Sequence, residues 1–262
     1  MTEKKKTTLA IRRDRRLPLV GVVLFMTVLL VAVIVFSTGS GFVRIPFPVV
    51  ARIIAAKLTG LEGLVARLDP LAPVVVMDVR LPRILTAALV GSGLAISGAV
   101  FQGILLNPLA DPYTLGVSAG AAFGASVALL IDFTLLGPWS VPAFAFCGAL
   151  ATLMAVIYLT ASSGNFSSGA LILSGIIVAA ILSAGVSFIK YLADEQVGII
   201  IFWLMGSFAS QTWGNVILTL VFVAFGFSVF VFFARDLNLM SMGDRAAASL
   251  GVDTRRTMLI LL

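Results

Sequence analysis

The chain has 262 residues, of which 60% are hydrophobic and 11% charged, and its net charge is +6. Soluble domains carry about a quarter charged residues, so the composition excludes an ordinary soluble domain. It predicts an all-α, polytopic bundle of transmembrane helices. The sequence has no histidine and no Gly-Lys pair, which excludes histidine nucleophiles, histidine proton relays and an ATP-binding P-loop. We therefore expect a protein that is not an enzyme, with no cofactor, catalytic residue or metal site.

A basic segment, residues 1–16, precedes the first apolar run at residues 17–36. A basic tail before a first span follows the positive-inside rule, under which lysine and arginine stay on the cytoplasmic side. We read residues 1–16 as a cytoplasmic tail beside membrane lipid. This interpretation also accounts for much of the net charge, so we expect no nucleic-acid partner.

Residues 37–79 mix charged residues, apolar residues and prolines, and residues 49–68 carry basic side chains at near-helical spacing. That spacing predicts either an amphipathic helix lying at the membrane interface or an ordinary solvated helix. Four apolar runs of about bilayer-spanning length follow. They are residues 84–106, 113–131, 133–161 and 170–189.

The next uncharged run, residues 197–234, is too long for one straight span. Small and polar residues at 206–214 predict a short half-helix and then a sixth span at residues 213–234. A polar stretch at residues 235–256 follows, and the last residues resemble the beginning of a seventh span. If the tail is on the cytoplasmic side, residues 162–169 and 235–256 are also on that side, and residues 37–79 are outside. The opposite orientation remains the alternative, because residues 44–80 carry several basic side chains.

Two Xaa-Pro pairs, Asn107-Pro108 and Asp111-Pro112, separate the second apolar run from the third. The residue before a proline is driven out of the helical region, so this segment is a turn. It is either a plain loop or irregular backbone that lines a water-filled pathway. Gly116, Gly120 and Gly124 follow at four-residue spacing, which predicts close helix packing along one face.

Four stretches in this order resemble the iron-siderophore (FecCD-type) ABC importer permeases, a group related to the cobalamin and haem permeases. They are "RLPRILTAALVGSGLAISGAVFQGILLNPLADPYTLGVSAGAAFGA", "LILSGIIVAAILSAGVSF", "FWLMGSFASQTW" and "LNLMSMGDRAAASLGVDTRR". The resemblance implies a permease domain over residues 17–262 in a fold of about ten spans, of which six to seven are present here, so the C-terminal spans are expected to be missing. It also implies a homodimer or paired homologous permease in the cytoplasmic (inner) membrane. The implied partners are separate ATPase subunits and a periplasmic or lipid-anchored substrate-binding protein.

The resemblance further implies roles for individual residues near the two membrane faces. Asn107 and Leu109 of the turn would form one side of an inner gate, and Ser168 and Gly169 the other. Arg80 and Arg83, at the outer end of the second span, would receive glutamates of the binding protein. The alternative for these arginines is a side chain that extends along the helix end to reach water.

Residues 237–256 would be the cytoplasmic segment that couples to the ATPase, and the alternative is a connecting loop. The resemblance includes Gly243 in this coupling segment, and the Asp244 carboxylate can cap the free backbone N–H groups at the start of a helix. Ala247 and Ala248 favour a helix with a small face, and Gly251 can end it.

Two other classes compete with an ABC permease. A secondary carrier or channel should have charged residues within its spans, and this sequence has none in mid-span. An intramembrane enzyme should have a nucleophile motif or paired aspartates, which are also absent. The expected ligand is an iron(III)-siderophore, with haem, cobalamin and oxyanions as the alternatives.

Overall fold

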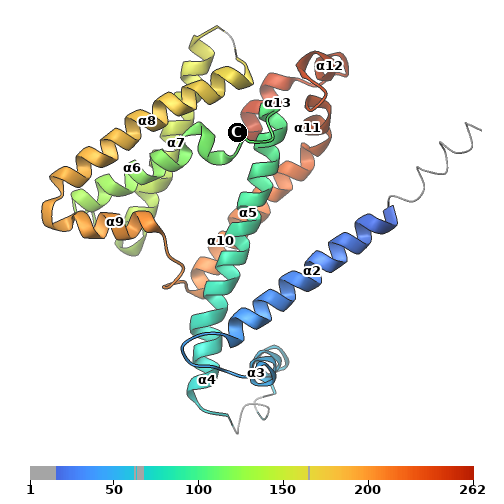
Figure 1. Cartoon of the computed structure of the whole chain (residues 1–262), viewed down its shortest axis with the longest axis vertical. Helices are drawn as coiled ribbons and strands as arrows, with labels where there is room; N and C mark the ends of the chain where they lie inside the picture. Colours follow the sequence, from blue (N-terminus) through green and yellow to red (C-terminus); the bar gives the residue numbers. More distant parts are fainter. Residues whose placement is uncertain (1–15, 62, 64–67, 165) are drawn as a thin grey trace, which may run out of the picture. The chain divides into compact units, whose positions relative to one another are not determined.

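The computed structural model describes residues 16–61, 63, 68–164 and 166–262, and the regular structure within them is helical throughout. The predicted tail, residues 1–16, lies outside this part except for Arg16. The α-helices are α2 (Arg16–Gly39), α3 (Phe47–Thr59), α4 (Leu71–Val74), α5 (Leu81–Leu105), α6 (Val117–Leu130), α7 (Ser140–Ser162), α8 (Ser168–Leu192), α9 (Val197–Met205), α10 (Trp213–Phe232), α11 (Ala234–Met240), α12 (Asp244–Ser249) and α13 (Thr254–Leu261) (Figure 1). The all-α prediction is confirmed.

Five helical segments in the described residues are long and apolar enough to cross a membrane. They are Leu19–Gly39, Leu71–Leu105, Gly137–Ser162, Ser168–Leu192 and Trp213–Phe232. The predicted third span is shorter than expected: a 3-10 turn, Pro112–Leu115, precedes α6, which has 14 residues. At 1.5 Å per residue α6 is about 21 Å long, less than the roughly 30 Å of a bilayer core.

The chain divides into two compact units, and the boundaries fall within α5, in the loop between α9 and α10, and within α10. The first unit comprises residues 1–88 and 208–217, and the second comprises residues 89–207 and 218–262. Each unit is described by itself below.

In the first unit, α3 is the helix predicted within residues 49–68, but it begins and ends earlier than expected. Gly60 follows it with φ +72°, a left-handed conformation that stops the helix. Residues 62 and 64–67 of the predicted range lie outside the described residues. The buried face of α3 carries Val50, Ile53 and Ala56, and it packs in a cluster with Ile45, Val76 and Leu81.

The second apolar run also differs from expectation, because its helix begins at Leu71 rather than near residue 84. Pro73 lies in the first helical turn, where the missing N–H needs no partner. The prolines therefore do not prevent a helix here, and the segment continues through a π-helical turn, Val75–Arg80, into α5.

This π turn has a carbonyl group that the helix itself cannot satisfy. The Leu81 N–H donates to the Val76 oxygen, five residues back, so the Met77 oxygen would need the N–H of residue 82. Residue 82 is proline and has none. Instead, the indole Nε1 of Trp213 donates to the Met77 oxygen at 3.0 Å, which attaches the start of α10 to the π turn.

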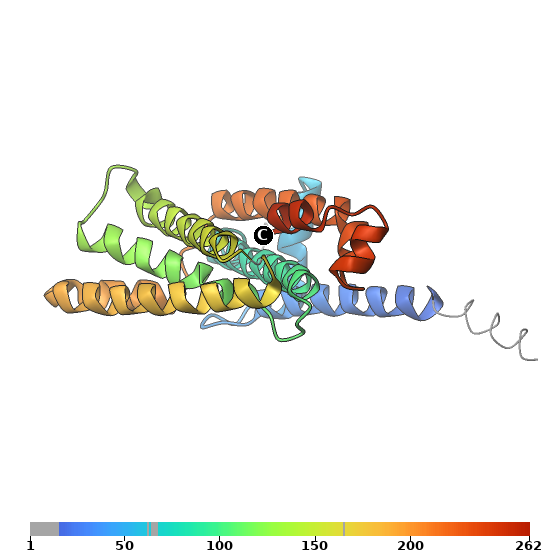
Figure 2. The same cartoon turned by 90° about the horizontal axis from the view of Figure 1, so that it is seen from above.

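In the second unit, α6, α7 and α8 lie side by side in both views (Figures 1 and 2). One buried cluster includes Leu171 near the start of α8, and another includes Ile189 near its end. Ile189 lies 18 residues after Leu171, which corresponds to about 27 Å of helix, so the clusters lie at opposite ends of the unit. The short helix α9 contributes Ile200 to the second cluster, and the predicted break after it is confirmed at Gly206–Thr212.

Candidate functional site

The turn between α5 and the 3-10 helix is stabilised by its own side chains. The side-chain Oδ1 of Asn107 accepts a hydrogen bond from the Leu109 N–H at 2.9 Å. The backbone oxygen of Asn107 accepts one from the Ala110 N–H at 3.0 Å. The Asp111 Oδ1 accepts from the Thr114 N–H at 2.9 Å. Proline lacks an N–H and cannot continue α5, so these asparagine and aspartate contacts replace the missing helical bonds.

The turn presents one apolar side chain to its surroundings. Leu109 is 86% exposed, whereas the next residue, Ala110, is buried. A leucine at the tip of a rigid turn is available to contact another molecule or another segment, but it is not part of the core of this unit.

The structure brings the two predicted gate elements together. The Ser168 hydroxyl donates to the backbone oxygen of Ile104, in the last turn of α5, at 3.4 Å. Ser167 caps α8, because its Oγ accepts from the Ala170 N–H, and Gly169 is exposed. The start of α8 and the end of α5 are therefore neighbours, although 64 residues separate Ser168 from Ile104.

The three spaced glycines do not form one stripe, which corrects the sequence-based interpretation. Gly116 precedes α6 with φ +75°, and a Cβ placed there would lie 3.1 Å from the Gly175 oxygen of α8. Gly120 and Gly124 instead face α7. A Cβ at Gly120 would lie 2.5 Å from the Gly148 oxygen, and one at Gly124 would lie 2.2 Å from the Phe144 oxygen. Gly116 thus closes the contact with α8, and the other two close the contact with α7.

Gly148 is the partner that the sequence analysis missed. A Cβ at Gly148 would lie 2.3 Å from the Gly120 oxygen, so the backbones of α6 and α7 touch directly. The sequence contains a pattern that predicts this contact, because Gly148 and Thr152 form a small-xxx-small pair at the same four-residue spacing.

Residues 237–256 are expected to form two short helices joined by a turn, but they contain the end of α11, all of α12 and the start of α13. The prediction that Asp244 caps the helix is wrong, because the N-cap residue of α12 is Gly243, with φ +101° and no side chain, and the helix begins at Asp244. Gly251 ends it with φ +88°. The Gly251 N–H donates to the Ala248 oxygen and the Val252 N–H to the Ala247 oxygen, the pair of bonds that defines a Schellman motif.

The two adjacent alanines of α12 face in different directions. Ala247 is fully buried, with an exposed fraction of 0%, whereas Ala248 is exposed. The prediction treated these alanines as equivalent, but Ala248 alone belongs to the outward face of the helix.

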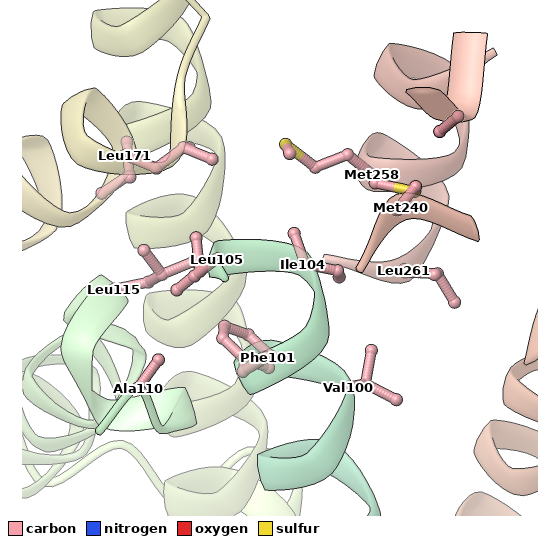
Figure 3. Close-up of a cluster of buried hydrophobic side chains, with 12 residues drawn as sticks. Val100, Phe101, Ile104, Leu105, Ala110, Leu115, Leu171, Met240, Met258 and Leu261 are labelled. Atoms are coloured by element: carbon pink, nitrogen blue, oxygen red, sulfur yellow. The ribbon is translucent and has the colours of Figure 1, made fainter. Parts of the chain in front are cut away.

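We call the buried residues around Ala247 the inner cluster. It joins the end of α5, the turn, α7, the start of α8, and α11 to α13 (Figure 3). Its buried members are Val100, Phe101, Ile104, Leu105, Ala110, Leu115, Val156, Leu171, Met240, Ala247, Met258 and Leu261. In Figure 3, Ile104 lies between Leu105 on one side and Met240 with Leu261 on the other.

A second contact that sequence reasoning missed joins α11 to α5. A Cβ at Gly103 would lie 2.9 Å from a terminal methyl group of Leu237. The predicted coupling segment therefore packs directly on the helix that leads into Asn107. Together with the inner cluster, this contact places residues 237–256 at the same end of the unit as the turn and the start of α8, as the predicted topology requires.

The two arginines of the predicted docking pair have different environments in the first unit. The Arg80 guanidinium donates to the backbone oxygen of Thr38 at 2.8 Å and also to that of Val43. It therefore holds the segment after α2 against the start of α5. Arg83 is exposed, and its side chain remains available to a partner.

Comparisons with known proteins agree with these motifs. The model of the FecCD transport family matches residues 20–262. The chain is 40% identical to the uncharacterized ABC transporter permease protein YvrB of Bacillus subtilis, over 87% of this chain and 65% of that protein. It is also 40% identical to the molybdate import system permease protein MolB of Haemophilus influenzae, over 87% of this chain and 66% of that protein.

A solved structure is similar over most of the chain. It is an inward-facing conformation of a candidate metal-chelate type ABC transporter, with a TM-score of 0.76 and 33% sequence identity over 92% of this chain and 71% of that one. The chain spans about two thirds of the length of the two curated relatives. By its sequence and its helical fold, the chain belongs to the FecCD transport family.

Proposed function

We propose that this chain is the transmembrane permease subunit of an ATP-driven importer in the cytoplasmic membrane. A separate ATPase subunit would supply the energy, and a substrate-binding protein would deliver the ligand at the outer face. The permease would work as a homodimer or beside a homologous permease. Its ligand would be an iron(III)-siderophore or a similar metal chelate, with molybdate-like oxyanions as the alternative that the relative from Haemophilus influenzae raises.

The inner cluster is the observation that carries this proposal. Buried side chains of α11 to α13 share one core with the end of α5, the turn and the start of α8. Protein interiors are close-packed and compress little, so they transmit displacement. A force applied to residues 237–256 would thus reach both predicted gate elements through direct packing.

The outward face of α12 supports the same proposal. Arg245, Ala248 and Leu250 are exposed, while Ala247 anchors the helix from the opposite side. A short helix that is fixed on one face and small at the centre of the other can enter a groove on a partner. In this proposal Ala248 contacts the ATPase, Ala247 holds α12 on the inner cluster, and Gly243 with Gly251 sets where the helix begins and ends.

The outer arginines have separate roles in this proposal. Arg83 receives a carboxylate of the binding protein, for which the planar guanidinium of arginine is well suited. Arg80 stabilises the surface around Arg83, because its guanidinium is already bonded to two backbone oxygens.

The proposal is tested by ligand uptake into proteoliposomes. The complete permease is reconstituted with the ATPase and the binding protein encoded beside it, and radiolabelled iron chelates, haem, cobalamin and molybdate are tested in turn. We expect uptake of one ligand class that requires both ATP and the binding protein. Uptake driven by an ion gradient without ATP would instead establish a secondary carrier and refute the proposal.

A further inference from the structure

A cation–π contact joins α13 to the segment before α8 within the second unit. The guanidinium carbon of Arg255 lies 5.6 Å from the ring centroid of Phe166. Phe166 immediately precedes Ser167, which caps α8, and Ser168 donates to the end of α5. The contact therefore lies at the base of the second predicted gate element.

Helix stability does not explain an arginine at position 255. Arg255 lies in the first turn of α13, where a positive charge is unfavourable because the N-terminal end of a helix is itself positive. The positive-inside rule favours any basic residue on this side and does not select position 255. Arg256 shares the same turn, the same charge and an exposed position. Within the part of the chain that the structure describes, an aromatic ring lies under Arg255 but none lies under Arg256.

Besides Arg255, Phe166 also contacts the inner cluster. The ring is half-buried and packs against the inner cluster. One part of the ring thus lies against the apolar core, while the guanidinium of Arg255 lies within cation–π distance. A ring held in this way is tied to α13 as well as to the core.

We propose that Arg255 is a positioning residue that ties the segment leading into Ser168 and Gly169 to the coupling segment. Through Phe166, the start of α8 follows α13 when the coupling segment moves. This inference rests on the proposed function for its mechanical meaning, but the contact can be tested without any partner protein.

The first experiment measures how well the ring is covered. Phe166→Trp introduces a fluorophore that binds cations at least as well as phenylalanine, and the three native tryptophans are subtracted by measuring the protein without this change. Quenching by acrylamide is recorded, because acrylamide is neutral and does not respond to the loss of a charge. The measured quantity is the ratio of indole that acrylamide can reach to indole that is covered. We expect Arg255→Gln to raise this ratio about two- to fivefold, the range for an exposed cation–π contact. Arg256→Gln should leave the ratio unchanged, and equal quenching in both variants would overturn the proposal.

The second experiment measures ligand taken up per ATP hydrolysed in the reconstituted complex. We expect Arg255→Gln to lower this ratio about two- to fivefold and Arg255→Lys to restore part of it. Arg235→Gln, at an exposed position in the first turn of α11 and outside residues 237–256, should match the wild type. Phe166→Leu removes the ring but keeps an apolar side chain, so it should lower the ratio as Arg255→Gln does. It takes the place of Arg255→Gln in this test if Arg255→Gln inserts poorly. A wild-type ratio in Phe166→Leu would overturn the coupling role. Absence of ATP-driven uptake in the wild type would refute the proposed function instead, and quenching alone would then decide the contact.

Discussion

The two alanines of α12 provide the sharpest test of how the permease receives work. Ala248→Trp places an indole on the exposed face, whereas Ala247→Trp places it at a position with no exposed surface. The same substitution at neighbouring positions should therefore give two different defects, one in partner docking and one in folding.

The expected free-energy changes follow from burial. Overpacking a close-packed core costs about 1–3 kcal/mol, so Ala247→Trp should lower the free energy of unfolding by at least that range. An exposed helical position costs roughly 0.5 kcal/mol for the lower helix propensity of tryptophan. At about 2–4 °C per kcal/mol, Ala247→Trp should lower Tm by several degrees and Ala248→Trp by about one or two.

The assay combines two measurements on the complete protein. Thermal stability is followed by size-exclusion chromatography of heated, detergent-solubilised permease. Stimulation of ATP hydrolysis by loaded binding protein is measured in vesicles. Ala248→Trp should retain stability and lose stimulation, while Ala247→Trp should lose stability first. Ala234→Trp is the control, because Ala234 is also exposed but lies at the start of α11, outside residues 237–256.

One result would refute this reasoning directly. If Ala248→Trp supports the same ATPase stimulation and uptake as Ala234→Trp, the partner does not contact the exposed face of α12. The coupling role proposed for residues 237–256 would then have to be abandoned.

Three further sets of substitutions test the helix packing, the roles of the two arginines and the topology. Gly120→Ala should lower the free energy of unfolding by about 1–3 kcal/mol, because its Cβ would lie 2.5 Å from the Gly148 oxygen; Gly91→Ala, which meets nothing within 4 Å, should be neutral or slightly stabilising in the same thermal assay. Arg80→Gln should lower Tm, whereas Arg83→Glu should leave Tm unchanged and weaken binding-protein docking in a pull-down; the opposite assignment would exchange their roles. After replacement of the native cysteine, Ser241→Cys should react with impermeant maleimide in inverted vesicles and not in intact cells, and labelling in intact cells would reverse the topology.

The sequence predicts most spans because an uncharged run of bilayer length has few alternatives. It also predicts the end of α12, since Gly251 supplies the left-handed residue that a Schellman motif needs. The early start of the second membrane helix was not predictable in the same way. Pro73 suggests a loop unless it is known to lie in the first helical turn. The hydrogen bond to the π turn comes from Trp213, which lies 136 residues away from Met77 along the chain.

The orientation of individual side chains was also beyond the sequence. In a six-residue helix such as α12, an alanine-rich sequence has no apolar stripe to show which side is buried, so Ala247 and Ala248 look alike. Four-residue spacing places Gly116 and Gly120 on one helical face, but the positive φ of Gly116 takes it out of the helix. Arg80 has the sequence context of a docking residue, and its backbone partners become evident only from the fold.

The Gly103–Leu237 contact indicates how movement of α11 would be passed to the gate. Since Gly103 has no side chain, Leu237 of α11 packs directly on α5 at this position. If α11 moved and α5 did not, the contact would open a void, and a methyl-sized void costs about 1 kcal/mol. The same movement would open further voids around Met240 and Ile104, which share the inner cluster. On the proposed mechanism, the inner end of α5 therefore moves with α11. Asn107, only four residues after Gly103, moves with this helix end and not independently of it.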